Sequence, residues 1–182
     1  MVQGVVKSLP EERFILRVIR ELSDPGEGAG IARAIAEQAE PLDWHGVSRR
    51  MSEEGIASLF YHRLDRFHLM PLLPAEAVKD LSDWYFADLK RNMAACAPLK
   101  RVFDRMNEKR LPFIVLKGIA LAERIYPGFA TRGMSDADIL VRKADMEAVD
   151  ACLTGLGYSP VDSTVGLAMA NPVGYLASLD YR

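Results

Sequence analysis

The chain has 182 residues, of which 49% are hydrophobic and 26% are charged, and its formal net charge is −2. This balance is typical of a globular protein with one or two domains and a core that needs no disulfide. It argues against nucleic acid as a partner, because nucleic acid favours basic surfaces. We expect a cytoplasmic protein that binds no membrane, since no signal-peptide pattern opens the chain and no apolar run reaches roughly 20 residues.

Residues 1–108 are expected to form a helical region. Apolar side chains recur at helical spacing from Phe14 to Leu22, after a capping-box pattern that begins at Ser8. Further helices are expected over residues 31–40, 43–54 and 56–67. The second of these has Asp43 as its N-cap, because a short polar side chain there accepts a hydrogen bond from the first helical turn.

A long amphipathic helix is predicted after Pro74. Its apolar residues step by three or four positions, which indicates one continuous buried stripe. The stripe consists of Leu81, Tyr85, Leu89, Met93, Cys96, Leu99, Phe103 and Met106. Pro98 lies inside the pattern and predicts a kink or a split, because proline removes a helical hydrogen bond. We expect Cys96 and Cys152 to be buried and reduced, since their separation fits no metal or redox motif.

The pattern changes after Leu111. Residues 113–116 are a compact apolar run that predicts a buried strand, and residues 137–141 predict a second strand. Helices are expected over residues 119–126 and 144–156. The predicted fold class is therefore α+β, with the helical region packed on a small α/β core formed by residues 109–182.

An Asp-x-Asp pair opens the second predicted strand. Side chains two positions apart on a strand point to the same face, so Asp136 and Asp138 are expected to converge. Two carboxylates make an oxygen-only site, which Mg²⁺ prefers. Two such ions about 4 Å apart can activate an attacking hydroxyl and stabilise a leaving pyrophosphate. The same pattern also occurs as a turn or surface feature, so the pair alone leaves both interpretations open.

Residues around the pair favour a phosphate-binding function. Lys117 and Gly118 follow the first predicted strand, where glycine lets phosphate approach the backbone and the next helix opens with N–H groups that favour an anion. Lys117 can pair with a triphosphate as a point charge, although a surface lysine is the alternative. Arg132 can hold phosphate through two hydrogen bonds, or it can form a salt bridge with Asp136 or Glu123.

Four segments occur in a characteristic order: Leu116-Lys117-Gly118, Tyr126-Pro127, the run from Arg132 to Val141, and Leu156-Gly157-Tyr158. Together they resemble an uncharacterised bacterial nucleotidyltransferase family of the DNA-polymerase-beta-like superfamily. The helical stretch 43–110 is also similar to the N-terminal region of that family. The resemblance implies a small mixed sheet flanked by helices. It also implies the transfer of a nucleoside monophosphate from an NTP with Mg²⁺.

The resemblance also implies roles for particular residues. Asp136 and Asp138 take the position of the metal ligands, with two Mg²⁺ ions as an option. Gly118 takes the place of the glycine on the phosphate side. Lys117 and Arg132 match basic positions of the family pattern and are expected to bind the triphosphate.

Two features depart from the superfamily pattern. A serine usually follows the glycine, whereas Ile119 follows Gly118 here. The superfamily also has a third carboxylate on a later strand, which helps to deprotonate the acceptor. The resemblance implies that this carboxylate lies beyond the helix that ends near Leu156, where Asp162 and Asp180 are the only carboxylate side chains, and both match the position poorly. We therefore expect a core that is incomplete at the C-terminus, either because the chain is a fragment or because the site has degenerated.

Two main functional hypotheses remain, and a third, nucleic-acid binding through the basic side of the helix over residues 75–106, is disfavoured by the mildly acidic overall charge. In the first, the chain is an enzyme that uses Mg²⁺ to move a nucleotidyl group from an NTP to an unknown acceptor, which is a small molecule or a protein. In the second, it is a catalytically degenerate nucleotide-binding or protein-interaction module of the same fold. A carboxylate within metal reach of Asp136 and Asp138 would favour the enzyme.

Overall fold

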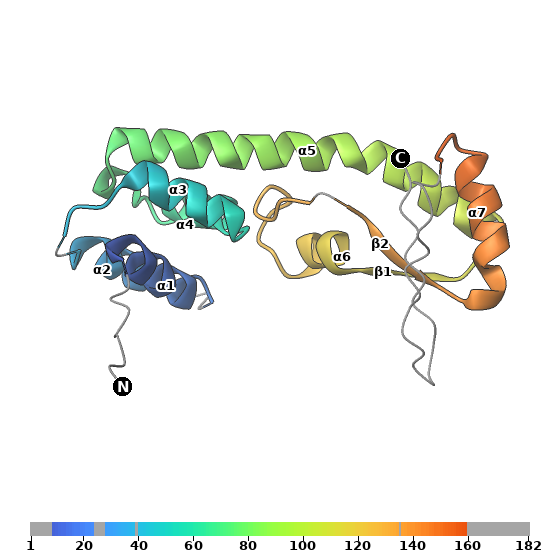
Figure 1. The fold of residues 1–182 in the computed structure, drawn as a ribbon, viewed down its shortest axis with the longest axis horizontal. Helices are drawn as coiled ribbons and strands as arrows, with labels where there is room; N and C mark the ends of the chain where they lie inside the picture. Colours follow the sequence, from blue (N-terminus) through green and yellow to red (C-terminus); the bar gives the residue numbers. More distant parts are fainter. Residues whose placement is uncertain (1–8, 24–27, 39, 135, 160–182) are drawn as a thin grey trace, which may run out of the picture. The chain divides into compact units, whose positions relative to one another are not determined.

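The computed structural model describes residues 9–23, 28–38, 40–134 and 136–159. Within these residues the fold is α+β, with seven α-helices and one two-stranded antiparallel sheet (Figure 1). The chain divides into two compact units. The first consists of Met1–Lys90 and Pro127–Gly133, and the second of Arg91–Tyr126 and Met134–Arg182. The domain division after residue 108 stays a prediction.

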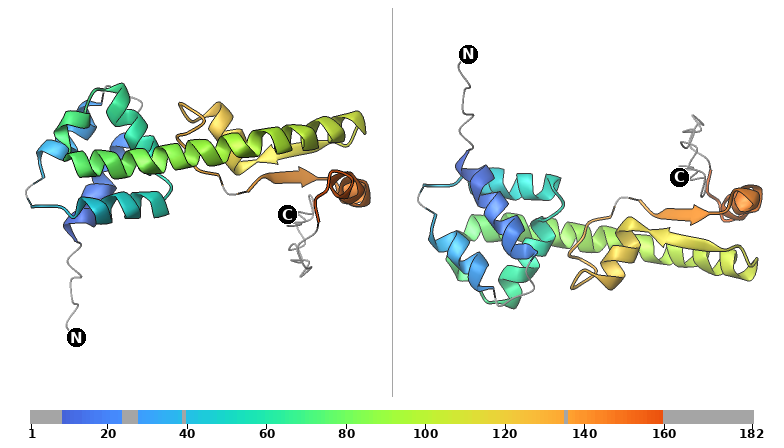
Figure 2. Two further views of the ribbon diagram at one scale, coloured as in Figure 1. Left: turned by 90° about the horizontal axis from the view of Figure 1, so that it is seen from above. Right: turned by 90° about the horizontal axis from the view of Figure 1, so that it is seen from below.

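The first unit is helical. It contains α1 (Pro10–Leu22), α2 (Ala29–Ala36), α3 (Trp44–Glu53), α4 (Ala57–Arg66), a 3₁₀ turn (Met70–Leu72) and the first part of α5 (Ala75–Glu108). Helices α1–α4 gather around that part of α5, as the two views of Figure 2, from above and from below, show. The predicted helices are confirmed, with shifted ends. Helix α2 begins early because Gly28 caps it with φ of 72°, a conformation that glycine adopts at little cost.

Two helix starts illustrate how local chemistry sets the element bounds. The predicted cap Asp43 is confirmed, because its carboxylate accepts a hydrogen bond from the Gly46 N–H at 3.1 Å. Helix α1 begins at Pro10, whose fixed φ suits a first turn. There the Glu12 carboxylate accepts from the N–H of the cap residue Leu9 at 3.2 Å. The predicted capping box has Ser8 as the cap and Glu11 as the acidic partner. In the structure the cap residue is Leu9 and the acidic partner is Glu12, so both positions are shifted by one residue.

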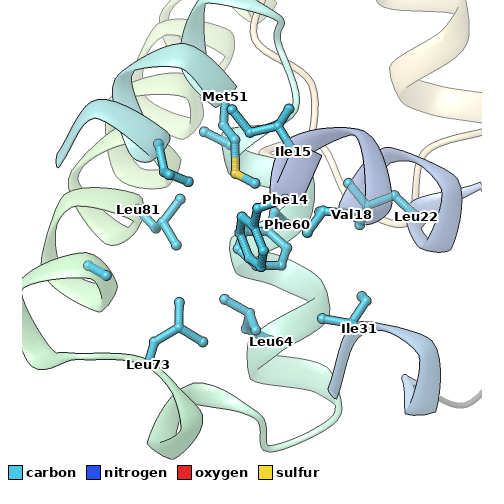
Figure 3. Close-up of a cluster of buried hydrophobic side chains, with 13 residues drawn as sticks. Phe14, Ile15, Val18, Leu22, Ile31, Met51, Phe60, Leu64, Leu73 and Leu81 are labelled. Atoms are coloured by element: carbon cyan, nitrogen blue, oxygen red, sulfur yellow. The ribbon is translucent and has the colours of Figure 1, made fainter. Parts of the chain in front are cut away.

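Aromatic rings form the centre of the first core. Phe14 and Phe60 are fully buried, with their ring centroids 6.4 Å apart in an edge-to-face arrangement, and Trp44 packs on Phe14 at 5.3 Å. Aliphatic side chains from α1 to α5 surround the two phenylalanines (Figure 3). They include Ile15, Val18, Leu22, Ile31, Met51, Leu64, Leu73 and Leu81. This core joins α1–α4, which are each too short to be more than marginally stable in water on their own, to α5.

The segment Pro127–Gly133 packs against Asp88 of α5, which lies in the same unit. Ser58 donates a hydrogen bond to Asp88 Oδ2 at 2.6 Å. A Cβ atom at Gly133 would lie 2.5 Å from Asp88 Oδ1, so only glycine fits against this carboxylate without a shift. Thr131 is buried in the same segment and donates to the Gly128 carbonyl at 2.6 Å. These contacts fix the backbone of the segment within the first unit.

The first unit contains a histidine whose titration should affect stability near neutral pH. Burial, and then the neighbouring Arg63 and Arg66 charges, hold the pKa of His62 below 6.5. Asp65 opposes this shift of the pKa more weakly. The unfolded state therefore takes up a proton first, and stability is lost as the pH falls below about 6.5.

We expect His62→Gln to remove part of this pH dependence, because glutamine does not titrate. The measurement is thermal unfolding of both proteins at a series of pH values between about 7.5 and about 5.5. The wild-type unfolding temperature should fall more steeply than that of the variant. Parallel curves over this range would contradict the expectation.

The second unit contains the sheet. Its elements are the rest of α5, β1 (Phe113–Leu116), α6 (Lys117–Arg124), β2 (Asp138–Val141), a 3₁₀ turn (Lys143–Asp145) and α7 (Met146–Thr154). The strands pair antiparallel, with Phe113 opposite Val141 and Leu116 opposite Asp138 (Figures 1 and 2). The mixed sheet that the resemblance implies is represented by this one pair in the described residues. Residues 160–182 of the predicted core lie outside them.

The two faces of the sheet differ in burial. Phe113, Ile139 and Val141 pack with a core from α5 and α7, where the rings of Phe103 and Phe113 stack at 5.2 Å. The core residues from the helices include Val102, Met106, Val149, Cys152 and Leu153. The opposite face is open, since Ile114 is 60% exposed there. Because side chains alternate along a strand, Asp138 lies on this open face.

The long helix departs from its predicted stripe in the middle. Helix α5 continues through Pro98 and is not split. Because Pro98 has no N–H, it cannot donate the helical hydrogen bond to the Ala94 carbonyl. Ala94 lies at an exposed position, where water can take the place of that donor. Met93 is 63% exposed and Cys96 is exposed, whereas Asn92 is fully buried. The stripe prediction is therefore wrong at these positions, because the helix buries a polar side chain where an apolar one was expected.

The prediction for the cysteines is confirmed only in part. Both are free thiols, and Cys152 is buried in the core of the second unit. Cys96 is exposed, because it lies on the uncovered face of α5 beside Met93.

Candidate functional site

The strand-to-helix junction at Lys117 has an unusual backbone. β1 ends at Leu116, and Lys117 is the first residue of α6. Its φ of 47° lies in the left-handed region, which residues with a Cβ atom rarely adopt. A residue with a Cβ atom in this conformation lowers the stability of the fold by about 1–3 kcal/mol, and the conformation persists only where the surrounding structure imposes it. Such strained residues cluster at functional sites, so the backbone of Lys117 makes this junction a candidate functional site.

The strand register brings the basic and acidic candidates together. Leu116 pairs with Asp138 across the sheet, which places the next residue, Lys117, beside the start of β2. Lys117 Nζ lies 3.1 Å from Asp138 Oδ2, with exposed fractions of 72% and 32% for the two side chains. An ion pair this exposed contributes only about 0–1 kcal/mol. Either partner can therefore exchange the other for a stronger ligand.

Gly118 packs against the segment that leads into β2. A Cβ atom at Gly118 would lie 3.4 Å from Met134 Cγ and 4.0 Å from the backbone oxygen of Asp136. These are ordinary contact distances, so the backbone of Gly118 is a neighbour of the backbone that carries Asp136. The expected role of Gly118 in phosphate binding stays a prediction.

Asp136 and Asp138 have different surroundings. β2 begins at Asp138, one residue later than expected, so Asp136 lies in the loop before the strand and is exposed. The alternation of a strand therefore orients Asp138 but does not by itself orient Asp136. Both belong to the second unit together with Lys117 and Gly118. The structure thus gathers four of the five predicted site residues in one unit.

Arg132 is the fifth predicted residue. It lies in the segment Pro127–Gly133, which belongs to the first unit, and its side chain is half-buried. Its predicted contact with phosphate stays a prediction.

One residue beside the site was not predicted from the sequence. Asn92 on α5 is fully buried, and its Oδ1 accepts a hydrogen bond from the Met134 N–H at 3.1 Å. Met134 precedes Asp136 by two residues. In the sequence, Asn92 is only a polar residue next to the apolar stripe of a predicted helix. That pattern does not identify Met134, 42 positions away, as its hydrogen-bond partner.

Both candidates for a third metal-binding carboxylate lie outside the described residues. Among the described residues, no group of three or more His, Cys, Asp or Glu side chains is placed to hold a metal ion. The two carboxylates named as third-ligand candidates, Asp162 and Asp180, lie outside these residues.

The comparisons with known proteins identify the class. Residues 40–174 match the model of a family described as an uncharacterised nucleotidyltransferase. The match covers more than half of the chain, so the protein belongs to this nucleotidyltransferase family. No curated protein and no solved structure was found to match it.

Within the ranges that the structure describes, no helix combines the length and apolar character that crossing a membrane requires.

Proposed function

We propose that the chain is an enzyme that transfers a nucleoside monophosphate from an NTP to an acceptor, using Mg²⁺ held by Asp136 and Asp138. The observation that carries this proposal is the Asp138 carboxylate at the open start of β2, with the Lys117 ammonium 3.1 Å away. Membership of a nucleotidyltransferase family supports an NTP as the substrate. The acceptor group is a hydroxyl, a phosphate or an amine.

The donor set suits the proposed metal. Carboxylate oxygens are the ligands that Mg²⁺ prefers, and it commonly binds through one or two of them plus the substrate phosphates. The Lys117 ammonium beside Asp138 Oδ2 shows that a cation can approach this carboxylate. When bound, Mg²⁺ would supply positive charge to the triphosphate and to the leaving pyrophosphate.

Lys117 has a proposed role that changes with the ligand. In the free protein it neutralises Asp138, and its exposed side chain is able to turn when a nucleotide arrives. The ammonium then pairs with a phosphate, while the N–H groups at the start of α6 next to Gly118 favour the same anion.

The proposed reaction is a substitution at the α-phosphorus. An acceptor oxygen or nitrogen forms a bond to this phosphorus, and the bond from the phosphorus to the oxygen that bridges to the β-phosphate breaks. The electron pair of the broken bond leaves with pyrophosphate, and the acceptor proton passes to a carboxylate or to water. The part of Lys117 is to hold the phosphates in position and to offset negative charge on the leaving group.

Replacing Lys117 by methionine should change two affinities in opposite directions. The competing ammonium is lost, so Asp138 should bind Mg²⁺ alone up to about fivefold more tightly, in line with an exposed ion pair. The phosphate contact is lost as well, so the affinity for Mg²⁺–NTP should fall. Titration calorimetry with each ligand measures both effects, and Lys117→Arg is the matched control that keeps the charge. A fall in both affinities, or a rise in both, would contradict the proposed exchange.

The reaction type is tested by the fate of two labels. The full chain is incubated with Mg²⁺, an NTP labelled at the α- or the γ-phosphate, and small-molecule or protein fractions of a cell extract as acceptors. We expect the α-label in a product and the γ-label in pyrophosphate, with neither result in EDTA. Transfer of the γ-label would identify a phosphoryl transfer instead. Absence of a product from every fraction would contradict an enzyme and favour the nucleotide-binding module.

A further inference from the structure

We propose that Asn92 is a positioning residue that sets the path of the backbone before Asp136, a role that rests on the function proposed above. Asn92 lies on α5 and is fully buried. Its Oδ1 accepts the Met134 N–H at 3.1 Å, across 42 positions of sequence. The hydrogen bond is itself buried, so water does not compete for either group.

The bonded residue lies where the chain needs support. Met134 belongs to the stretch between α6 and β2, which has neither a helix nor a strand to satisfy its backbone. A buried N–H in such a stretch requires a partner, and here a side chain from a distant helix supplies it. Asp136 follows only two residues later, so few backbone torsions separate it from the anchored N–H. The position of the Asp136 backbone therefore depends on the bond to Asn92.

Met134 links this anchor to the other half of the site. Its side chain is buried, and its Cγ would lie 3.4 Å from a Cβ atom at Gly118. Gly118 follows Lys117, whose ammonium lies 3.1 Å from Asp138 Oδ2. One hydrogen bond from α5 thus fixes a residue that both precedes Asp136 and packs against the phosphate side of the site.

The choice of residue fits this role. A helix that only needed to fill its core would place an apolar side chain at position 92, and burying an amide is unfavourable unless it is hydrogen-bonded. Residues that orient metal ligands without touching the metal typically change its affinity by about 10–100-fold when they are removed. We expect an effect of this size, mediated by the loop and without any contact between Asn92 and the ligand.

The test compares Asn92→Ala with a control variant that also loses buried side-chain atoms. Val102→Ala is the control, because Val102 is a buried residue of the same helix and the same unit that packs in the core away from Met134. The affinity for Mg²⁺ with a non-hydrolysable NTP analogue is measured for the full chain and both variants. Asn92→Ala should bind about 10–100-fold more weakly than wild type, whereas Val102→Ala should bind like wild type. Equal affinities in the two variants would overturn the proposal.

Hydrogen exchange gives a readout that needs no nucleotide. The Met134 amide should be protected in the wild type and in Val102→Ala, and should lose its protection in Asn92→Ala. Should Asn92→Ala fail to fold, Asn92→Ser is used, since it retains a hydroxyl and is expected to show both changes more weakly. A wild type that binds no nucleotide but shows this protection pattern would refute the proposed function and leave the anchor in place. A Met134 amide that exchanges freely in the wild type would refute the anchor itself.

Discussion

Replacing Asp136 and Asp138 together by asparagine is expected to abolish Mg²⁺-dependent nucleotide binding while the fold is retained. Asparagine keeps the shape of aspartate but removes the negative charge, and Mg²⁺ is a hard cation that typically binds proteins through one or two carboxylates. The fold should tolerate the change, because Asp136 is exposed and the Asp138 carboxylate forms a partly exposed ion pair at 3.1 Å. The stability loss from that pair should stay below about 1 kcal/mol.

Titration calorimetry with Mg²⁺–NTP measures the binding, and thermal unfolding measures the stability. Asp145→Asn is the matched control, since Asp145 is another acid of the second unit and accepts a 2.6 Å hydrogen bond from Arg142 Nε. The control should bind nucleotide like wild type. Unchanged binding in the double variant would refute the assignment of Asp136 and Asp138 as metal ligands.

Replacing Phe60 by alanine should have the largest effect on stability, a loss of about 3–5 kcal/mol. Phe60 is fully buried between the helices of the first unit, with its ring 6.4 Å from that of Phe14. The loss combines the burial of a ring with the cavity that its removal leaves, because well-packed neighbours relax only in part. Such a loss is a large fraction of the roughly 5–15 kcal/mol that typically stabilises a domain.

Denaturant unfolding of both proteins gives this difference. Phe86→Ala provides the comparison, since Phe86 is 56% exposed on α5 and contacts Tyr85 ring to ring at 5.5 Å. Its removal should cost less than about 1 kcal/mol. Similar losses for Phe60→Ala and Phe86→Ala would contradict a core centred on Phe14 and Phe60.

The helices of the first unit could be predicted because their signals are local. The spacing of apolar residues from Phe14 to Leu22 and the cap at Asp43 each lie within a few positions of the element that they define. The strand at Phe113–Leu116 was also predictable, because a short apolar run rich in β-branched residues follows a break in the helical pattern. Local patterns therefore predicted most of the elements, with errors mainly at their ends.

The features that were missed depend on distant neighbours. The exposure of Met93 and the burial of Asn92 follow from which face of α5 the rest of the chain covers, and helical periodicity does not contain that information. The left-handed backbone of Lys117 is equally hidden, because no local rule favours lysine with positive φ. For the site, the sequence pattern proposed which residues belong to it, while the 3.1 Å contact between Lys117 and Asp138 required the strand register.

The central claim is a metal-dependent nucleotide site, and isothermal titration of the four NTPs into the purified chain tests it most directly. Each titration is run with Mg²⁺ and repeated with EDTA. We predict that at least one NTP binds in Mg²⁺ and that EDTA removes this binding. No binding of any NTP in Mg²⁺, or binding that EDTA leaves unchanged, would contradict the claim.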